Sequence, residues 1–230
     1  MRIIDFHSHI LPQADHGSDG IEMSMQQVRY AVNAGVTDII ATPHFYNNFD
    51  TPEAFADRCS RGLDMLNEEI DRSGLNIKIH RGCELNLQLD LMKLSSWDEF
   101  RIAGTDYVLV EFPFNHWAEW FIRAFDEIRD NYGLIPIVAH IDRYPEERED
   151  ELFDREYLVQ INASVMSGFR KRHFYKREIQ HNKVHFLGSD SHASGKKHYE
   201  NFAAALRYFG NDVSRLMKNA ETVLNNGRIL

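Results

Sequence analysis

Short apolar runs alternate with longer amphipathic stretches along this chain. The runs are rich in valine and isoleucine and are apolar on both faces, which is typical of parallel strands covered by helices. They predict seven strands, at residues 3–6, 38–41, 77–80, 107–110, 135–139, 157–161 and 184–187. The amphipathic stretches predict helices at residues 22–34, 52–73, 118–132, 172–181 and 198–209, with short helices after residue 211. The pattern therefore indicates repeated βα units.

Several predicted helices have recognisable ends. Thr51 precedes a proline, and proline is favoured at the first position of a helix. Gly35, Gly74 and Gly133 each follow a predicted helix, where glycine can adopt the left-handed conformation that ends it. These signals support the boundaries of the first three helices.

The βα units follow one another without a linker rich in proline, glycine or serine, so residues 1–230 are expected to form a single domain. Such units form a parallel sheet that is either open or closed into a barrel. A histidine or an acidic residue ends six of the seven predicted strands. An open sheet binds ligands at one switch point, whereas a barrel gathers the C-terminal ends of all its strands around one mouth. The pattern therefore favours an α/β fold of the (β/α)7 barrel type.

The residues at these strand ends are of the types that bind metal ions. His7 and His9 stand two apart, so their side chains leave the strand on the same side, and Asp190 and His192 repeat this spacing. The remaining candidates are His16, which lies in a turn, and His44, Glu84, Glu111 and His140. Imidazole and carboxylate groups bind borderline divalent ions, so these residues predict one shared metal centre. For the two glutamates the alternative is a buried salt bridge.

Composition narrows the class of protein. A chain of 230 residues with 43% hydrophobic residues is typical of a globular domain. Its two cysteines give no disulfide framework, and neither a signal-peptide pattern nor an apolar stretch of membrane-spanning length occurs. A cytoplasmic protein is therefore expected. The formal net charge of −9 argues against general nucleic-acid binding.

Taken in order, the motifs resemble the PHP superfamily, named for polymerase and histidinol phosphatase. In particular, the chain resembles the bacterial PHP-type protein-tyrosine phosphatases encoded with capsule and exopolysaccharide genes. The resemblance covers nearly the whole chain. It is carried by Asp5-Phe6-His7-Ser8-His9-Ile10-Leu11-Pro12, Asp15-His16-Gly17, Ala41-Thr42-Pro43-His44, Gly82-Cys83-Glu84-Leu85, Val110-Glu111-Phe112, Ala139-His140-Ile141-Asp142-Arg143-Tyr144, Gln160-Ile161-Asn162-Ala163-Ser164 and Ser189-Asp190-Ser191-His192.

The resemblance implies a distorted seven-stranded barrel around three divalent metal ions. Manganese, iron and zinc all suit such ligands, and manganese is expected to support activity. The implied ligands are His7, His9, His16, His44, Glu84, Glu111, His140, Asp190 and His192, with Glu84 as a bridging carboxylate. His16 departs from the family pattern, which usually has an acidic residue there.

Phosphate-binding and proton-donating residues are also implied. Arg143 matches one phosphate-binding arginine of the family, whereas Lys196 and Lys197 stand where a second arginine is often found. A lysine supplies a point charge without the bidentate fork of arginine. Candidate proton donors are His116, Asp142 and His198, each of which could equally be a surface or supporting residue.

The implied activity is metal-dependent hydrolysis of phosphomonoesters by a metal-bridging hydroxide, most specifically a protein-tyrosine phosphatase activity. Six imidazoles and three carboxylates around three divalent ions leave a net charge of about +3, which suits a phosphate dianion. The implied partner is the phosphotyrosine-containing tail of an autophosphorylating tyrosine kinase. Two alternatives stay open: a phosphatase acting on a small molecule, of the histidinol-phosphate type, or on a nucleotide, and a metal-stabilised module that only binds a partner. A cysteine-dependent phosphatase is excluded because neither cysteine is followed by the required arginine.

Two further groups of residues have more than one interpretation. The basic residues of the segment 170–177 predict either a solvated helix face or a docking surface for an acidic, phosphorylated tail or a nucleic acid. Aromatic residues follow two of the strand ends and could stack on a phosphotyrosine ring or pack the next helix. They are Phe45, Tyr46, Phe49, Phe114, Trp117 and Trp120.

Overall fold

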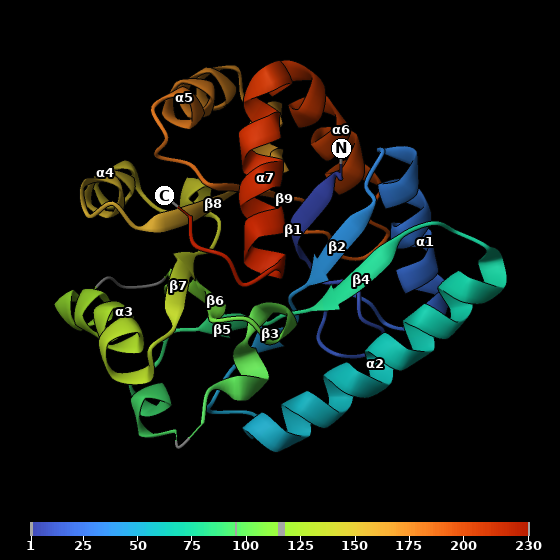
Figure 1. Ribbon diagram of the computed structural model, residues 1–230, viewed down its shortest axis with the longest axis horizontal. Coiled ribbons are helices and arrows are strands. Elements are labelled where there is room, and N and C mark those ends of the chain that lie inside the picture. Colours follow the sequence, from blue (N-terminus) through green and yellow to red (C-terminus); the bar gives the residue numbers. More distant parts are fainter. Residues whose placement is uncertain (1, 95, 115–117, 230) are drawn as a thin grey trace.

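The structure, a computed structural model, describes residues 2–94, 96–114 and 118–229 (Figure 1). Within these residues the strands form two sheets, and every pair of neighbouring strands is parallel. The first sheet has the order β1 (Ile4–Ser8), β2 (Asp38–Ala41) and β4 (Lys78–Arg81). The second has the order β3 (His44–Phe45), β5 (Glu84–Asn86), β6 (Tyr107–Glu111), β7 (Ile135–Val138), β8 (Leu158–Asn162) and β9 (Phe186–Gly188).

Two of the predicted strands are each followed, after a short break, by a second strand that was not predicted. After β2 the chain passes Pro43 and resumes as β3, and after β4 it passes Gly82 and resumes as β5. Because β2 pairs with β4 and β3 pairs with β5, the two segments stay side by side across the break. Proline cannot donate to a ladder, and a Cβ on Gly82 would lie 3.0 Å from Cγ2 of Ile40. The predicted count of seven strands is therefore not confirmed, since the described chain forms nine.

The last strand returns to the first and curls the sheet. Ser8 and Ser191 form a parallel bridge, and the amide of His9 donates to the carbonyl of Ser191 at 3.0 Å. The amide of Asp190 donates to the carbonyl of His7 at 2.8 Å. These bonds place the residues after β9 directly beside those at the end of β1. The fold is therefore a curled parallel α/β sheet, as predicted at this coarser level.

Seven α-helices lie around the two sheets within the described residues (Figure 1). They are α1 (Ile21–Asn33), α2 (Pro52–Ser73), α3 (Glu119–Tyr132), α4 (Glu146–Asp154), α5 (Phe169–Gln180), α6 (Lys196–Phe209) and α7 (Val213–Leu224). The predicted cap of α2 is confirmed, because the Thr51 hydroxyl accepts the amide of Ala54 at 3.2 Å. Gly74 and Gly133 end α2 and α3 at positive φ angles of 64° and 65°. None of the described helices has the length and apolarity needed to cross a membrane.

Three helix predictions need correction. Helix α4 was not predicted, because its sequence is mostly acidic and buries only Glu149, Leu152 and Phe153. Helix α5 begins at Phe169, three residues before its predicted start. The tail forms the short 3₁₀ helix Gly210–Asp212 and then the longer helix α7, whose apolar face packs against β1 and β9. For α7, packing against the sheet decides the helix, which a local pattern does not report.

A partly buried ion pair at the start of β2 joins the N-terminus to the first sheet. Asp38 accepts hydrogen bonds from Arg2 Nε at 3.1 Å and from His80 Nε2 at 2.8 Å. Burial by itself would raise the pKa of Asp38, but these hydrogen bonds lower it to about 2. A lowered pKa in the folded state means that the carboxylate stabilises the fold above the pKa of the unfolded chain, and that this contribution is lost as the pH falls towards 2.

We expect Asp38→Asn to lower the free energy of unfolding at pH 7 by about 2 kcal/mol, and to cost progressively less below about pH 4. Urea unfolding of both proteins between pH 7 and pH 3 measures this difference. Asp64→Asn, at an exposed position of α2, is the matched control and should leave the free energy of unfolding unchanged at every pH. A difference between Asp38→Asn and the parent that stays constant with pH would contradict the assignment.

Candidate metal centre

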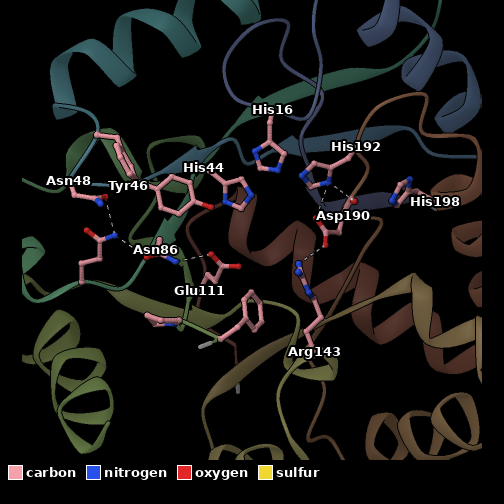
Figure 2. Close-up of a pocket in the computed structure, with 14 residues that line it drawn as sticks. His16, His44, Tyr46, Asn48, Asn86, Glu111, Arg143, Asp190, His192 and His198 are labelled. Carbon is pink, nitrogen blue, oxygen red and sulfur yellow. Dashed lines mark hydrogen bonds and ion pairs between the residues drawn. The ribbon is translucent and has the colours of Figure 1, made fainter. Parts of the chain in front are cut away.

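A cavity of about 650 Å³ opens at the C-terminal ends of the strands (Figure 2). Its wall carries imidazole, carboxylate, amide and aromatic groups together with one guanidinium. The residues that matter here are His16, His44, Tyr46, Phe49, Asn86, Glu111, Phe114, Arg143, Asp190, His192 and His198. They come from segments far apart in the sequence, so only the curled sheet brings them together.

The carboxylate of Glu84 lies at the centre of the imidazoles behind this wall. Its Oε2 is 3.1 Å from Nε2 of His7, from Nε2 of His9 and from Nδ1 of His44. Its Oε1 is 2.6 Å from Nε2 of His140. Glu84 is only 1% exposed, so its charge has to be balanced by these neighbours or by cations.

The ligand-type atoms gather in three overlapping groups. Within each group one potential ligand atom from every residue lies within 4.8 Å of the others. The groups are His7, His9 and Asp190; His9, His44 and His192; and His44, Glu84 and Glu111. His140 joins the third group through Glu84 and through Glu111, whose Oε1 is 3.3 Å from its Nε2.

The arrangement of these atoms fits divalent cations. Nε2 of His7 faces Nε2 of His9 at 3.0 Å, and two imidazole lone pairs at that distance repel unless a cation or proton lies beside them. Nδ1 of His44 and Oδ1 of Asp190 are buried and form no hydrogen bond with any described residue. Buried polar atoms need partners, and nitrogen and oxygen donors are the ligands of borderline divalent ions.

The pKa values of the histidines at the site depend on burial and on the neighbouring carboxylates. Burial alone would lower the pKa of His140, but the charge of Glu84 and a hydrogen bond to Glu111 raise it to about 10. Burial lowers the pKa of His44 and of His192 to about 4. These two imidazoles are therefore neutral near pH 7, the state in which an imidazole binds a metal ion.

A second set of polar groups orients the histidines. Asp15 accepts from His9 Nδ1 at 2.6 Å and from the amides of His44 and Gly17, each at 2.8 Å. The side-chain oxygen of Gln160 lies 3.1 Å from Nδ1 of His7 and accepts the amide of His140 at 2.7 Å. Such bonds fix the tautomer and orientation of a ligating ring.

Sequence reasoning assigned no role to Gln160. The available signal was an amide residue in the middle of an otherwise apolar strand, between Val159 and Ile161. Asn162, at the end of the same strand, donates from Nδ2 to Asp190 Oδ2 at 2.8 Å. The strand without a predicted ligand, β8, therefore supports the ligands of its neighbours.

His16 lies at the cavity but belongs to none of the three groups. Its exposed ring stacks near those of His44 and His192, with centroid separations of 5.0 and 4.9 Å. Figure 2 shows the three rings along one side of the cavity. His16 is therefore in place to act at the centre, while its role as a ligand stays a prediction.

The predicted phosphate-binding residues differ in where they lie. Arg143 lines the cavity, with Nη1 3.4 Å from Oδ2 of Asp190 (Figure 2). His198 also lines it, with its ring 6.4 Å from that of His192. Lys196 is exposed at the first position of α6 and does not line the cavity. Whether Lys196 takes the place of a phosphate-binding arginine stays a prediction.

The aromatic residues and proton-donor candidates predicted from the sequence lie partly on the wall of the cavity and partly in the core. Tyr46, Phe49 and Phe114 line the cavity, whereas Phe45 is fully buried in the core and Trp120 packs on Phe121. Asp142 is buried away from the cavity, where its Oδ1 accepts the amide of Asn162 at 2.7 Å, so it is not placed as a proton donor. His116 and Trp117 lie outside the described residues.

Comparison with known proteins identifies the family of this chain. Residues 3–226 match the family model for capsular polysaccharide synthesis, CpsB/CapC. The chain belongs to this family. The predicted resemblance to capsule-associated tyrosine phosphatases is thereby confirmed.

Several members of the family carry a functional name. The tyrosine-protein phosphatase YwqE of Bacillus subtilis is 29% identical over 99% of this chain and 93% of its own length. The tyrosine-protein phosphatase CpsB of Streptococcus agalactiae is 28% identical over 97% of this chain and 99% of its own. A crystal structure from work on YwqE and the CpsB of Streptococcus pneumoniae, described as metal-dependent tyrosine phosphatases, matches with a TM-score of 0.83 at 28% identity, covering 99% of this chain and 96% of that one.

The turn that carries His16 depends on a glycine. A Cβ on Gly17 would lie 2.1 Å from Cβ and 2.5 Å from the carbonyl oxygen of His9, so an alanine must displace the turn and its carboxylate, Asp15. We expect Gly17→Ala to weaken metal binding and activity by about 10- to 100-fold, the usual cost of losing a group that orients ligands. Metal content per chain, measured by mass spectrometry, and titration of Mn²⁺ into the chelated protein check this.

Gly20 offers the matched control in the same segment, because a Cβ there would meet no atom within 4 Å. Gly20→Ala should bind metal as the parent does. Unchanged metal affinity in Gly17→Ala would show that the turn does not position the ligands.

Proposed function

We propose that this protein is a metal-dependent protein-tyrosine phosphatase with three divalent ions at the mouth of a barrel. Counting β2 with β3 and β4 with β5 as one interrupted strand each, the nine strands make a seven-stranded barrel. The observation that carries the proposal is the buried carboxylate of Glu84 among converging imidazoles, beside a cavity that also holds Arg143. It is supported by full-length similarity to proteins named tyrosine-protein phosphatases. Ligands held only for structure would not need an open cavity with an arginine on its wall.

The three groups of ligand atoms suggest how the ions are held. We assign the ligands as His7, His9, His16, His44, Glu84, Glu111, His140, Asp190 and His192, with Glu84 shared between ions. When bound, the ions lower the pKa of a water molecule, so that it becomes a nucleophile, and they neutralise charge on the phosphoryl oxygens. Manganese is the metal we expect to support activity, because the set combines imidazole with carboxylate.

The side chains of the cavity wall then bind and orient the phosphate ester. Arg143 presents its guanidinium to the phosphoryl group, and its charge suits the equatorial oxygens of the transition state. Its guanidinium carbon lies 4.6 Å from the centre of the Phe114 ring, which holds the side chain at the wall. Phe114 and Tyr46 provide aromatic surface for a phenyl ring.

The leaving group needs little help from a protein acid. Hydrolysis breaks the bond between phosphorus and the tyrosyl oxygen and releases phosphate and a phenolate, whose conjugate acid has a pKa of about 10. Burial lowers the pKa of His198, so its ring is neutral near pH 7. We assign His198 to hydrogen bonding at the edge of the cavity rather than to obligatory proton donation.

A phosphotyrosine-containing polypeptide, such as the tail of an autophosphorylating tyrosine kinase, is the substrate that this cavity suits best. The cavity is open and has aromatic groups on its wall, which favours a ring on an extended chain over a small polar alcohol. The alternative is a small phosphorylated molecule of the histidinol-phosphate type or a nucleotide.

Phosphate release from four substrates in the presence of Mn²⁺ tests the proposal. We expect kcat/KM for a phosphotyrosyl peptide to exceed by at least about tenfold that for a phosphoseryl peptide, histidinol phosphate or a short oligonucleotide, because a phenolate leaves more easily than an alkoxide. A chelator should abolish all turnover. Equal or faster hydrolysis of histidinol phosphate or the oligonucleotide would favour the alternative.

A further inference from the structure

A second cavity, of about 390 Å³, lies between α4 and α5. It is next to the cavity of about 650 Å³ at the candidate metal centre, which we call the catalytic cavity. Its wall includes Tyr144, Glu149, Arg170, Lys171 and Tyr175. Tyr144 directly follows Arg143, which lines the catalytic cavity, so one short segment separates the two. A ligand that fills both would pass over this segment.

Lys171 links the second cavity to the segment that carries Arg143. Its ammonium donates to the carbonyl oxygen of Asp142 at 2.7 Å, next to the peptide nitrogen of Arg143. An ammonium carries three donors, so two remain for another acceptor. The charge of Lys171 is thereby held beside the residue we assign to phosphate.

Arg170 is the second cation of this wall. Its side chain is exposed, and it forms no hydrogen bond or ion pair with any residue that the structure describes. By contrast, the guanidinium of Arg172 lies on Tyr208 at 5.4 Å, and Nζ of Lys176 lies on the same ring at 4.9 Å. Arg170 and Lys171 are therefore the cations of α5 that are directed to the cavity.

The acidic groups at this cavity offset only part of that charge. Glu149, which forms part of the wall, is 8% exposed and accepts the hydroxyl of Tyr175 at 2.7 Å. Burial raises the pKa of Glu149 to about 7, so near neutral pH it is charged only part of the time. The other acidic residue of the wall, Glu146, lies at the exposed start of α4. The wall therefore carries two cations against one full and one partial negative charge, in a chain whose net charge is −9.

We propose that the second cavity binds an acidic side chain of the polypeptide that carries the phosphotyrosine, and that Arg170 and Lys171 thereby select substrates with a nearby glutamate or aspartate. This inference rests on the proposed function and names its sequence preference. Because the rest of the protein is acidic and repels an acidic chain, a local pair of cations is needed to hold one there.

The test uses phosphotyrosyl peptides that carry one glutamate, moved through the five positions on each side of the phosphotyrosine, with glutamine and lysine peptides as partners. For the Mn²⁺-loaded parent, we expect kcat/KM to rise about tenfold for glutamate over glutamine at the favoured position, mainly through a lower KM. The preference should shrink in 0.5 M salt, because the contact is electrostatic.

Reversing the charge of Arg170 tests whether this residue causes the preference for glutamate peptides. Arg170→Glu should bring the ratio of glutamate to glutamine peptides to about one and create a preference for the lysine peptide, and Lys171→Gln should lower the same ratio. Arg61→Glu, at an exposed position of α2 on the other side of the molecule, makes the same change of charge and should keep the ratio of the parent (Figure 1). Hydrolysis of a small aryl phosphate in the same samples reports whether the metal centre is intact.

The outcomes separate the two proposals. A glutamate preference that persists in Arg170→Glu, or is absent from the parent, overturns the second cavity as a subsite while leaving the phosphatase function in place. An oligonucleotide that competes more strongly than the glutamate peptide, and only when Arg170 is present, overturns it in favour of a nucleic acid. A parent that hydrolyses the aryl phosphate but no phosphotyrosyl peptide rejects the proposed function itself.

Discussion

A buried carboxylate that faces four imidazoles is the interaction on which the rest of the structure depends. Glu84 contacts His7 in β1 and His9 directly after it, His44 in β3, and His140 two residues after β7. An isolated charge in such a place would cost several kcal/mol, so it persists only with cations or protonated partners around it. The curled sheet supplies the partners, and the spacing of their nitrogen and oxygen atoms suits metal ions.

Closing the sheet is the step that completes this arrangement. Strand β9 approaches β1 so closely that a Cβ on Gly188 would lie 2.5 Å from Cβ of His7. That contact, with the amide of Ser189 donating to the buried Asp5 at 2.7 Å, fixes Asp190 beside the first strand. Residues separated by most of the chain therefore share a ligand group, and the order of strands, rather than any single motif, determines the geometry.

Much of the secondary structure was predictable from local patterns in the sequence. The bounds of β2 and α2 were predicted correctly, because an apolar run and a capped amphipathic helix carry their own signals. The break between β4 and β5 and the helix α4 were not, since both depend on how neighbouring segments pack. In the site, the histidines and acids that end strands were found by residue type. Gln160 was missed because an amide side chain does not by itself indicate a metal or phosphate site.

Anomalous X-ray diffraction from crystals of the metal-loaded protein tests the central claim most directly, because it locates metal ions independently of any activity. We expect three anomalous peaks at the C-terminal ends of the strands, at least two of them within about 2.0–2.6 Å of a carboxylate oxygen of Glu84. Peaks located elsewhere, or a fully loaded centre in which Glu84 contacts no ion, would contradict it.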